Sequence, residues 1–116
     1  MHLTIVDDLE ENLELYQDVL EGDFQLELIQ QPFKLFEFLH DHKTDLLLLD
    51  FHLPNIDGFE LFKRIRKTHK NLPIIFITGD PSEETMINAL NLGAVDFLRK
   101  PVSIPELVAR IKNKIS

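Results

Sequence analysis

Four consecutive leucines followed by an aspartate, in the segment DLLLLD at residues 45–50, constrain the fold more than any other feature of the chain. A short continuous apolar run bounded by polar residues predicts a strand that is buried on both faces. Such strands are typical of parallel sheets, because the helices of the crossover connections cover both sides. Asp50 would then stand at the carboxyl end of this strand, and in open parallel sheets ligands bind at that edge.

Short apolar runs alternate with helical patterns along the whole chain. We expect five strands, at residues 3–6, 25–29, 46–50, 74–78 and 95–98. The first helical pattern has one apolar face, made of Leu9, Leu13, Tyr16 and Leu20. Strict alternation predicts βαβ units with right-handed crossovers. We therefore expect an α/β fold, a flavodoxin-like (βα)5 three-layer sandwich with a parallel five-stranded sheet in the order 2-1-3-4-5.

Glycines and capping residues mark the expected helix ends. Gly22 and Gly93 follow the first and fourth helical patterns, where glycine commonly terminates a helix. The segment Asp80-Pro81-Ser82-Glu83 predicts the start of the fourth helix, with Asp80 as the N-cap and Pro81 at the first helical position.

Length and composition limit the function classes. The chain has 116 residues, and we expect residues 1–116 to form one domain. It has no cysteine, which excludes thiol chemistry and favours a cytoplasmic location. Its net charge of −8 argues against direct nucleic-acid binding. No apolar run is long enough for membrane insertion.

Polar residues stand at the predicted carboxyl ends of several strands. They are Asp7, Asp8, Asp50, Thr78 and Lys100, the last followed by Pro101. In a doubly wound sheet these loops converge, so the three carboxylates would repel one another unless a cation joined them. Ligands that are all oxygen suit Mg²⁺ (or Mn²⁺), which also binds phosphate oxygens. A lysine and a hydroxyl opposite the acids could bind a phosphoryl group, and a carboxylate such as Asp50 could be its nucleophile.

These residues and their spacing resemble the receiver domain of two-component response regulators, the CheY-like family, over essentially the whole chain. The matching motifs are the Asp7-Asp8 pair, LLLLDFHLPNIDGFEL, IIFITG and DFLRKP. The resemblance implies that Asp50 accepts a phosphoryl group from a sensor histidine kinase, a histidine phosphotransfer protein or a small phosphodonor. It also implies that Mg²⁺ is held by Asp8, Asp50 and the backbone carbonyl of His52, with Asp7 acting mainly through water.

The resemblance further assigns residues to the loops and to a switch. Pro54 and Gly58 would shape the loop after the phosphoacceptor, and the bond before Pro101 would be cis. On phosphorylation Thr78 would move toward the phosphate and Phe97 would rotate inward behind it. The alternative for Phe97 is a permanently buried core aromatic.

Two less standard positions would flank the phosphate, His52 and Asp80, and we expect them to set the lifetime of the phosphorylated form. His52 could instead contribute through its backbone carbonyl alone. The output surface implied by the resemblance consists of the fourth helix, the fifth strand and the fifth helix. A downstream protein, a fused output domain or a second copy of the chain, forming a dimer, would bind there.

Two other function classes stay open. A phosphohydrolase of the haloacid dehalogenase type uses similar strand-end residues, but it needs a second aspartate where this chain has His52. A receiver-like interaction module without phosphorylation is the other alternative, although all the key polar positions are filled. We therefore expect a signalling phosphoacceptor that catalyses only its own phosphorylation and dephosphorylation.

Overall fold

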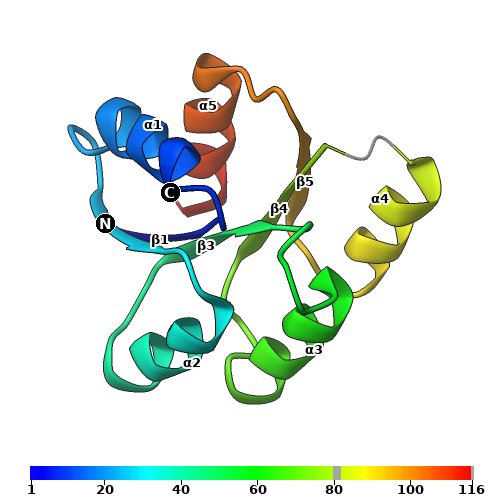
Figure 1. Ribbon diagram of the computed structural model, residues 1–116. Coiled ribbons are helices and arrows are strands. Elements are labelled where there is room, and N and C mark those ends of the chain that lie inside the picture. Colours follow the sequence, from blue (N-terminus) through cyan, green and yellow to red (C-terminus); the bar gives the residue numbers. More distant parts are fainter. Residues whose placement is uncertain (80–81, 116) are drawn as a thin grey trace.

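The computed structural model describes residues 1–79 and 82–115, with only the backbone of residues 83 and 115. These residues form strands and helices in strict alternation (Figure 1). The strands are β1 (His2–Val6), β2 (Gln25–Ile29), β3 (Leu46–Asp50), β4 (Ile74–Thr78) and β5 (Asp96–Arg99). The helices are α1 (Glu10–Leu20), α2 (Pro32–Asp41), α3 (Gly58–Thr68), α4 (Glu83–Asn91) and α5 (Ile104–Ile115).

The strands pair in parallel in the order β2-β1-β3-β4-β5, which confirms the predicted order. Helices α1 and α5 cover one face of the sheet, and α2, α3 and α4 cover the other (Figure 1). The architecture is therefore the flavodoxin-like three-layer sandwich. Because all strands run the same way, the loops that follow β1, β3, β4 and β5 lie at one edge of the sheet.

The leucine run of β3 serves two separate cores. Every residue of β3 and of β4 is buried. Leu47 and Leu49 pack in the core beneath α2 and α3, whereas Leu46 and Leu48 pack in the core beneath α1 and α5. Side chains alternate between the faces of a strand, so a strand covered on both sides needs apolar residues at every position.

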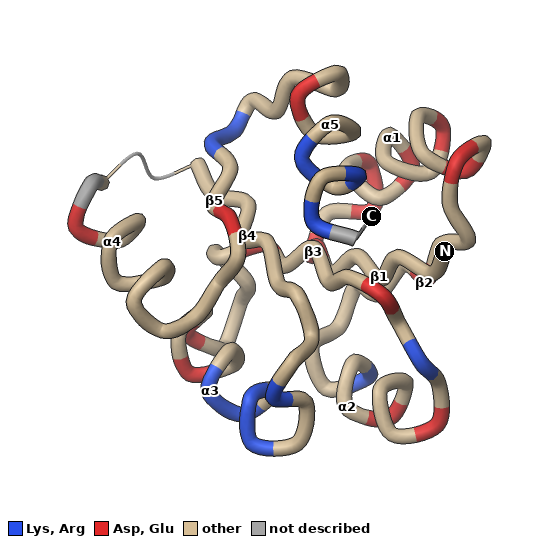
Figure 2. Tube along the Cα trace, turned by 180° about the vertical axis from the view of Figure 1, so that it is seen from behind, with Lys and Arg blue, Asp and Glu red and all other residues tan. Residues whose placement is uncertain are grey.

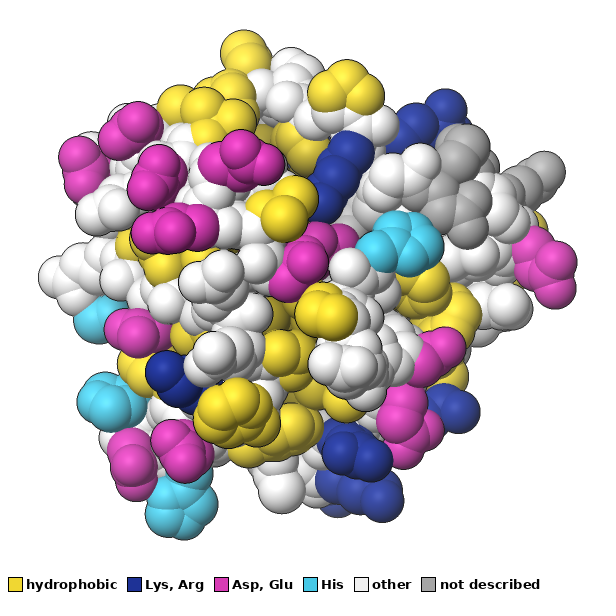
Figure 3. All heavy atoms as spheres, viewed as in Figure 1, with side chains coloured by type: hydrophobic (Ala, Val, Ile, Leu, Met, Phe, Trp, Pro, Cys, Tyr) yellow, Lys and Arg dark blue, Asp and Glu magenta, His cyan; other side chains and the backbone are white. Residues whose placement is uncertain are grey.

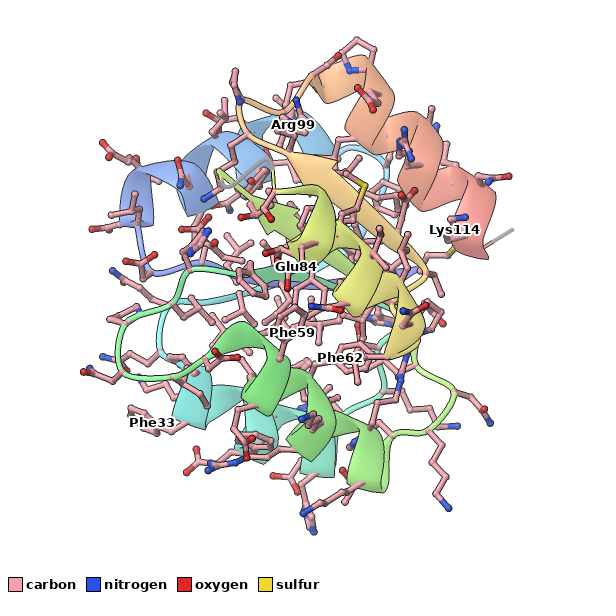
Figure 4. All side chains as sticks on the ribbon, turned by 90° about the vertical axis from the view of Figure 1, so that its right-hand side faces the viewer. Phe33, Phe59, Phe62, Glu84, Arg99 and Lys114 are labelled. Atoms are coloured by element: carbon pink, nitrogen blue, oxygen red, sulfur yellow. The ribbon has the colours of Figure 1, made fainter. Side chains whose placement is uncertain are left out.

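Aromatic side chains of α3 fill the space between this helix and the sheet. Figure 4 shows Phe59 and Phe62 pointing from α3 toward the strands, and their rings contact Phe76 of β4 at centroid distances of 6.4 and 5.5 Å. Phe33 of α2, by contrast, projects into solvent and is 63% exposed (Figure 4).

Charged residues are unevenly distributed over the helices. Figure 2 shows Lys and Arg gathered near the end of α3 and along α5, whereas α1 is predominantly acidic. Acidic residues in the first turn of α1 and basic residues in the last turns of α3 and α5 complement the helix dipoles. Among the residues that the structure describes, no helix is both long and apolar enough to cross a membrane.

One side chain of the predicted apolar face of the first helix is not part of it. Leu13, Tyr16 and Leu20 are buried as expected, but Leu9 is 46% exposed. Leu9 is the N-cap of α1 and has an extended backbone, with φ −97° and ψ 117°. The helical spacing therefore does not apply to Leu9, because this residue precedes the first helical turn and its backbone is not helical.

The start of the fourth helix also differs from the prediction. Helix α4 begins at Glu83, and its N-cap is Ser82, whose side chain accepts a hydrogen bond from the Thr85 amide at 3.3 Å. The predicted cap, Asp80, lies outside the described residues. The predicted end of this helix is confirmed, since Gly93 has a φ of 105° just after the last helical turn.

We predict that Gly58→Ala will destabilise the fold by about 2–3 kcal/mol. A methyl group there would lie 2.7 Å from a ring carbon of Phe51 and 2.8 Å from its carbonyl oxygen. Urea unfolding monitored by circular dichroism would measure the loss. Gly22→Ala is the matched control, because a methyl group at Gly22 meets no atom within 4 Å. An equal effect of the two changes would contradict the steric argument.

Candidate functional site

The loop after β1 and the last residue of β3 bring three carboxylates together at the carboxyl edge of the sheet. Asp7, Asp8 and Asp50 each offer a carboxylate oxygen, and these atoms lie within 4.8 Å of one another. Asp7 and Asp50 are buried, with exposed fractions of 2% and 3%, and Asp8 is half-buried. Figure 3 views this edge of the sheet, where further acidic side chains gather over α1. The predicted convergence of the three acids is therefore present in the fold.

Lys100 reaches the acids from the loop after β5. Its Nζ atom lies 3.1 Å from Oδ2 of Asp50 and 3.7 Å from Oδ2 of Asp7. Its backbone amide donates a hydrogen bond to the Thr78 carbonyl at 2.6 Å, which ties this loop to the end of β4. The Lys100-Pro101 peptide bond is cis, as expected. One ammonium group is therefore shared, unequally, between two buried carboxylates.

Backbone and side-chain amides hold the two buried carboxylates. Oδ1 of Asp50 accepts a hydrogen bond from the His52 amide at 3.0 Å. Oδ1 of Asp7 accepts one from the Leu9 amide at 2.9 Å. The Asn12 side-chain amide lies across the Asp7 carboxylate, 3.3 Å from Oδ1 and 3.2 Å from Oδ2. These donors fix the orientation of both carboxyl groups.

Burial and mutual repulsion determine the electrostatics of the site. Burial raises the pKa of Asp7, and the charge of Asp50 raises it further, while the Leu9 amide, Lys100 and Asn12 oppose the shift. Burial, together with the charges of Asp7 and Asp50, raises the pKa of Tyr16 to about 12. The site therefore carries an excess of negative potential that a bound cation would reduce.

The donor set fits a hard divalent cation. Asp7, Asp8 and Asp50 offer oxygen atoms, and Lys100 only partly offsets the charge of these carboxylates. Mg²⁺ and Mn²⁺ prefer carboxylate, carbonyl and water oxygens. The residues present could hold such an ion.

The proposed hydroxyl, switch and loop residues belong to β4, to β5 and to the segment after β3. Thr78, at the end of β4, is fully buried. Phe97 of β5 is half-buried and its ring centroid lies 6.4 Å from that of Phe76, so it is neither fully solvent-exposed nor fully in the core. Pro54 is exposed in the loop after β3, and Gly58 is the first residue of α3, packed on Phe51.

The two predicted lifetime residues differ in what the structure describes. His52 is exposed, and its ring contacts the Phe51 ring edge-on at a centroid distance of 5.1 Å. Asp80 lies outside the described residues. The backbone of His52 binds Asp50 while its side chain faces solvent, so both alternatives for His52 stay predictions.

Sequence reasoning missed Asn12 and Tyr16 as neighbours of the cluster. Both belong to α1, four residues apart and hence on one side of the helix. The helical spacing correctly predicts that Tyr16 belongs to the apolar face, but it does not predict that the charges of Asp7 and Asp50 raise the pKa of its hydroxyl. The available signal for Asn12 was an uncharged amide in an otherwise acidic helix start, too weak to predict a contact.

Comparison with known proteins places this site in a family. The family model described as the response regulator receiver domain matches residues 3–112. The chain belongs to this family. Its fold and its strand order agree with this assignment.

Regulatory proteins of several bacteria are similar in sequence. The nisin biosynthesis regulatory protein NisR of Lactococcus lactis subsp. lactis is 37% identical over 117 residues, covering 97% of this chain and 49% of NisR. The regulatory protein VanRc of Enterococcus gallinarum is 33% identical over 114 residues, covering 97% of this chain and 49% of VanRc. The receiver domain thus spans about half the length of the curated relatives it matches.

Solved receiver domains superpose on the whole chain. The non-phosphorylated HemR receiver domain from Leptospira biflexa has a TM-score of 0.91 and 29% identity, covering 99% of this chain and 94% of that receiver-domain chain. A CheY-like response regulator receiver domain protein from Methanospirillum hungatei JF-1 has a TM-score of 0.91 and 29% identity, covering 98% and 92% of the two chains.

We predict that Asp7→Asn will stabilise the metal-free receiver domain at neutral pH. The pKa of Asp7 is higher in the fold than its ordinary value, so its contribution to stability is present at low pH and is lost as pH rises through that raised pKa. The melting temperature at pH 7.5 should increase by about 4 °C, corresponding to roughly 1 kcal/mol, and the gain should shrink toward pH 4.

Thermal unfolding in a chelating buffer between pH 4 and 8 measures this difference. Asp18→Asn, on an exposed residue of the same helix, is the control. A lower melting temperature for Asp7→Asn at pH 7.5 would mean that the hydrogen bonds to Asp7 outweigh the cost of burying its charge.

Proposed function

We propose that this receiver domain is a phosphoacceptor that takes a phosphoryl group on Asp50 in a Mg²⁺-dependent reaction. The observation that carries the proposal is the contact of Lys100 with Asp50 at 3.1 Å inside a cluster of three carboxylates. An acidic cluster alone would be compatible with simple metal binding. A buried lysine-paired aspartate beside it is suited to phosphoryl transfer, because the lysine can neutralise charge on the transferred group.

In the proposed reaction an oxygen of Asp50 forms a bond to phosphorus while the bond from phosphorus to the donor breaks. With a phosphohistidine donor, the imidazole nitrogen keeps the electron pair of that bond and takes up a proton. The His52 amide orients the carboxylate, and Lys100 and the Thr78 hydroxyl would contact the phosphoryl oxygens. Mg²⁺ or Mn²⁺, held by Asp8, Asp50 and the His52 carbonyl, with Asp7 acting through water, would offset the charge of those oxygens.

The proposed donor is a sensor histidine kinase or a histidine phosphotransfer protein. The signal would pass to a fused output domain or to a separate downstream protein. The first alternative is supported by NisR and VanRc, since this chain covers about half of each. We propose that residues 1–116 form the receiver domain and that it acts in the cytoplasm. Hydrolysis of a separate substrate, as in haloacid dehalogenases, is set aside because the chain belongs to the receiver family.

The proposed output surface consists of α4, β5 and α5. It exposes the apolar side chains of Ile87 and Leu90 in α4, and Val95, just before β5, is exposed as well; a partner or a second copy of the chain could cover them. Thr78 and Phe97 would link this surface to the phosphate. Reversing a mostly inactive population requires about 5.5 kcal/mol of differential stabilisation, which contacts of the phosphoryl group with Lys100 and Thr78 would have to supply.

We predict one phosphoryl adduct per chain after incubation with acetyl phosphate and Mg²⁺, detected by intact-protein mass. The adduct should be absent without a divalent ion and absent in Asp50→Asn, because Asp50 is the carboxylate that lies closest to Lys100, at 3.1 Å, and Asp7 lies farther from it, at 3.7 Å. Asp41→Asn, on an exposed aspartate of α2, should form the adduct like the wild type. An adduct that persists in Asp50→Asn would contradict the assignment of the phosphoacceptor.

We predict that His52→Ala will shorten the lifetime of this adduct roughly threefold, because the exposed ring next to Phe51 would partly cover the approach of water to a phosphorylated Asp50. Decay is followed by mass after removal of acetyl phosphate. An unchanged lifetime would mean that His52 contributes to the site through its backbone alone. A longer lifetime would mean that the imidazole assists the attacking water.

A further inference from the structure

Asn12 is a neutral side chain that binds an acid of the site from outside the family motifs. It is half-buried in the first turn of α1 and donates to the carboxylate of Asp7, at 3.3 Å from Oδ1 and 3.2 Å from Oδ2. The same Oδ2 atom faces Nζ of Lys100 at 3.7 Å. Asn12 and Lys100 therefore both interact with Oδ2 of Asp7.

The position of Lys100 between Asp50 and Asp7 depends on the hydrogen bonds that each carboxylate accepts from other donors. Asp50 binds Nζ at 3.1 Å through Oδ2, and its Oδ1 accepts from the His52 amide. Among the described residues, Oδ2 of Asp7 accepts a hydrogen bond from Asn12 at 3.2 Å, and the ammonium of Lys100 lies 3.7 Å away as an ion-pair partner. Without the amide of Asn12, a buried carboxylate oxygen would lose a hydrogen bond, and such a loss is costly. The nearest available replacement is Lys100.

We infer that Asn12 is a positioning residue that keeps Lys100 closer to Asp50 than to Asp7. When the amide is removed, Lys100 shifts toward Asp7 and its ammonium competes there with the divalent cation. The inference rests on the proposed function, since it concerns how the same site binds its metal and its phosphoryl group.

A double-mutant cycle on the Mg²⁺ dissociation constant tests this role, because coupling between two residues appears only when one acts through the other. The four proteins are the wild type, Asn12→Ala, Lys100→Met and the double variant, titrated with MgCl₂ by calorimetry. Fluorescence of Tyr16 gives a second readout, since the chain has one tyrosine and no tryptophan. Alanine is a strong helix former, so Asn12→Ala should leave α1 intact.

Asn12→Ala should weaken Mg²⁺ binding about fivefold, the effect of losing one ordinary hydrogen bond. In the Lys100→Met background the same change should weaken it less than twofold, because the competing ammonium is gone. Asn12→Gln, which keeps an amide donor, should restore part of the affinity. Gln17→Ala removes an exposed amide from the same helix and should bind Mg²⁺ like the wild type.

Equal weakening in both backgrounds would overturn the inference, since Asn12 would then act on Asp7 or on the fold without Lys100. An unchanged dissociation constant for Asn12→Ala would overturn it as well. Adduct formation by the wild type with acetyl phosphate separates the two proposals. An adduct without coupling between Asn12 and Lys100 would contradict only the role of Asn12. Coupling without an adduct would contradict only the phosphoacceptor function. Undetectable Mg²⁺ binding by the wild type sinks both.

Discussion

The ion pair of Lys100 with Asp50 joins two loops that are fifty residues apart in the sequence. It lies at the edge where β1, β3 and β5 end, and it places a positive charge among carboxylates that would otherwise repel one another. A buried pair of this kind is weak support for overall stability, because both ions lose hydration. Its importance is positional, since it holds the end of β3 and the segment after β5 within 3.1 Å of each other.

The main features of the fold could be predicted because they follow from strong, local patterns. The leucines of β3 need apolar surroundings on both sides, and a parallel sheet between helix layers provides them. The handedness of crossovers leaves few strand orders, of which 2-1-3-4-5 is the commonest for five strands, and the gathering of Asp7, Asp8 and Asp50 follows from strand direction. None of these steps required knowledge of a side-chain conformation.

The parts that could not be predicted depend on the geometry of single residues. Leu9 has the spacing of the buried face, but one extended residue before the helix turns it outward. Ser82 and Asp80 are both good capping residues, so the sequence could not decide between them. The contact of Asn12 with Asp7 depends on a side chain reaching back across the first turn of α1, and residue spacing carries no such information.

The aromatic packing around Phe76 gives the proposed switch a physical basis. Phe76 is fully buried in β4, and its ring centroid lies 5.6 Å from that of Phe51, directly after Asp50, and 6.4 Å from that of Phe97 in β5. Close-packed cores do not deform continuously, so a displacement at the Asp50 loop favours a second discrete packing over a gradual strain. Phe97 is half-buried at the margin of this core, whereas Phe76 is fully buried within it. A phosphoryl group on Asp50 would therefore act on the output surface by changing which position of Phe97 packs best against a fixed Phe76.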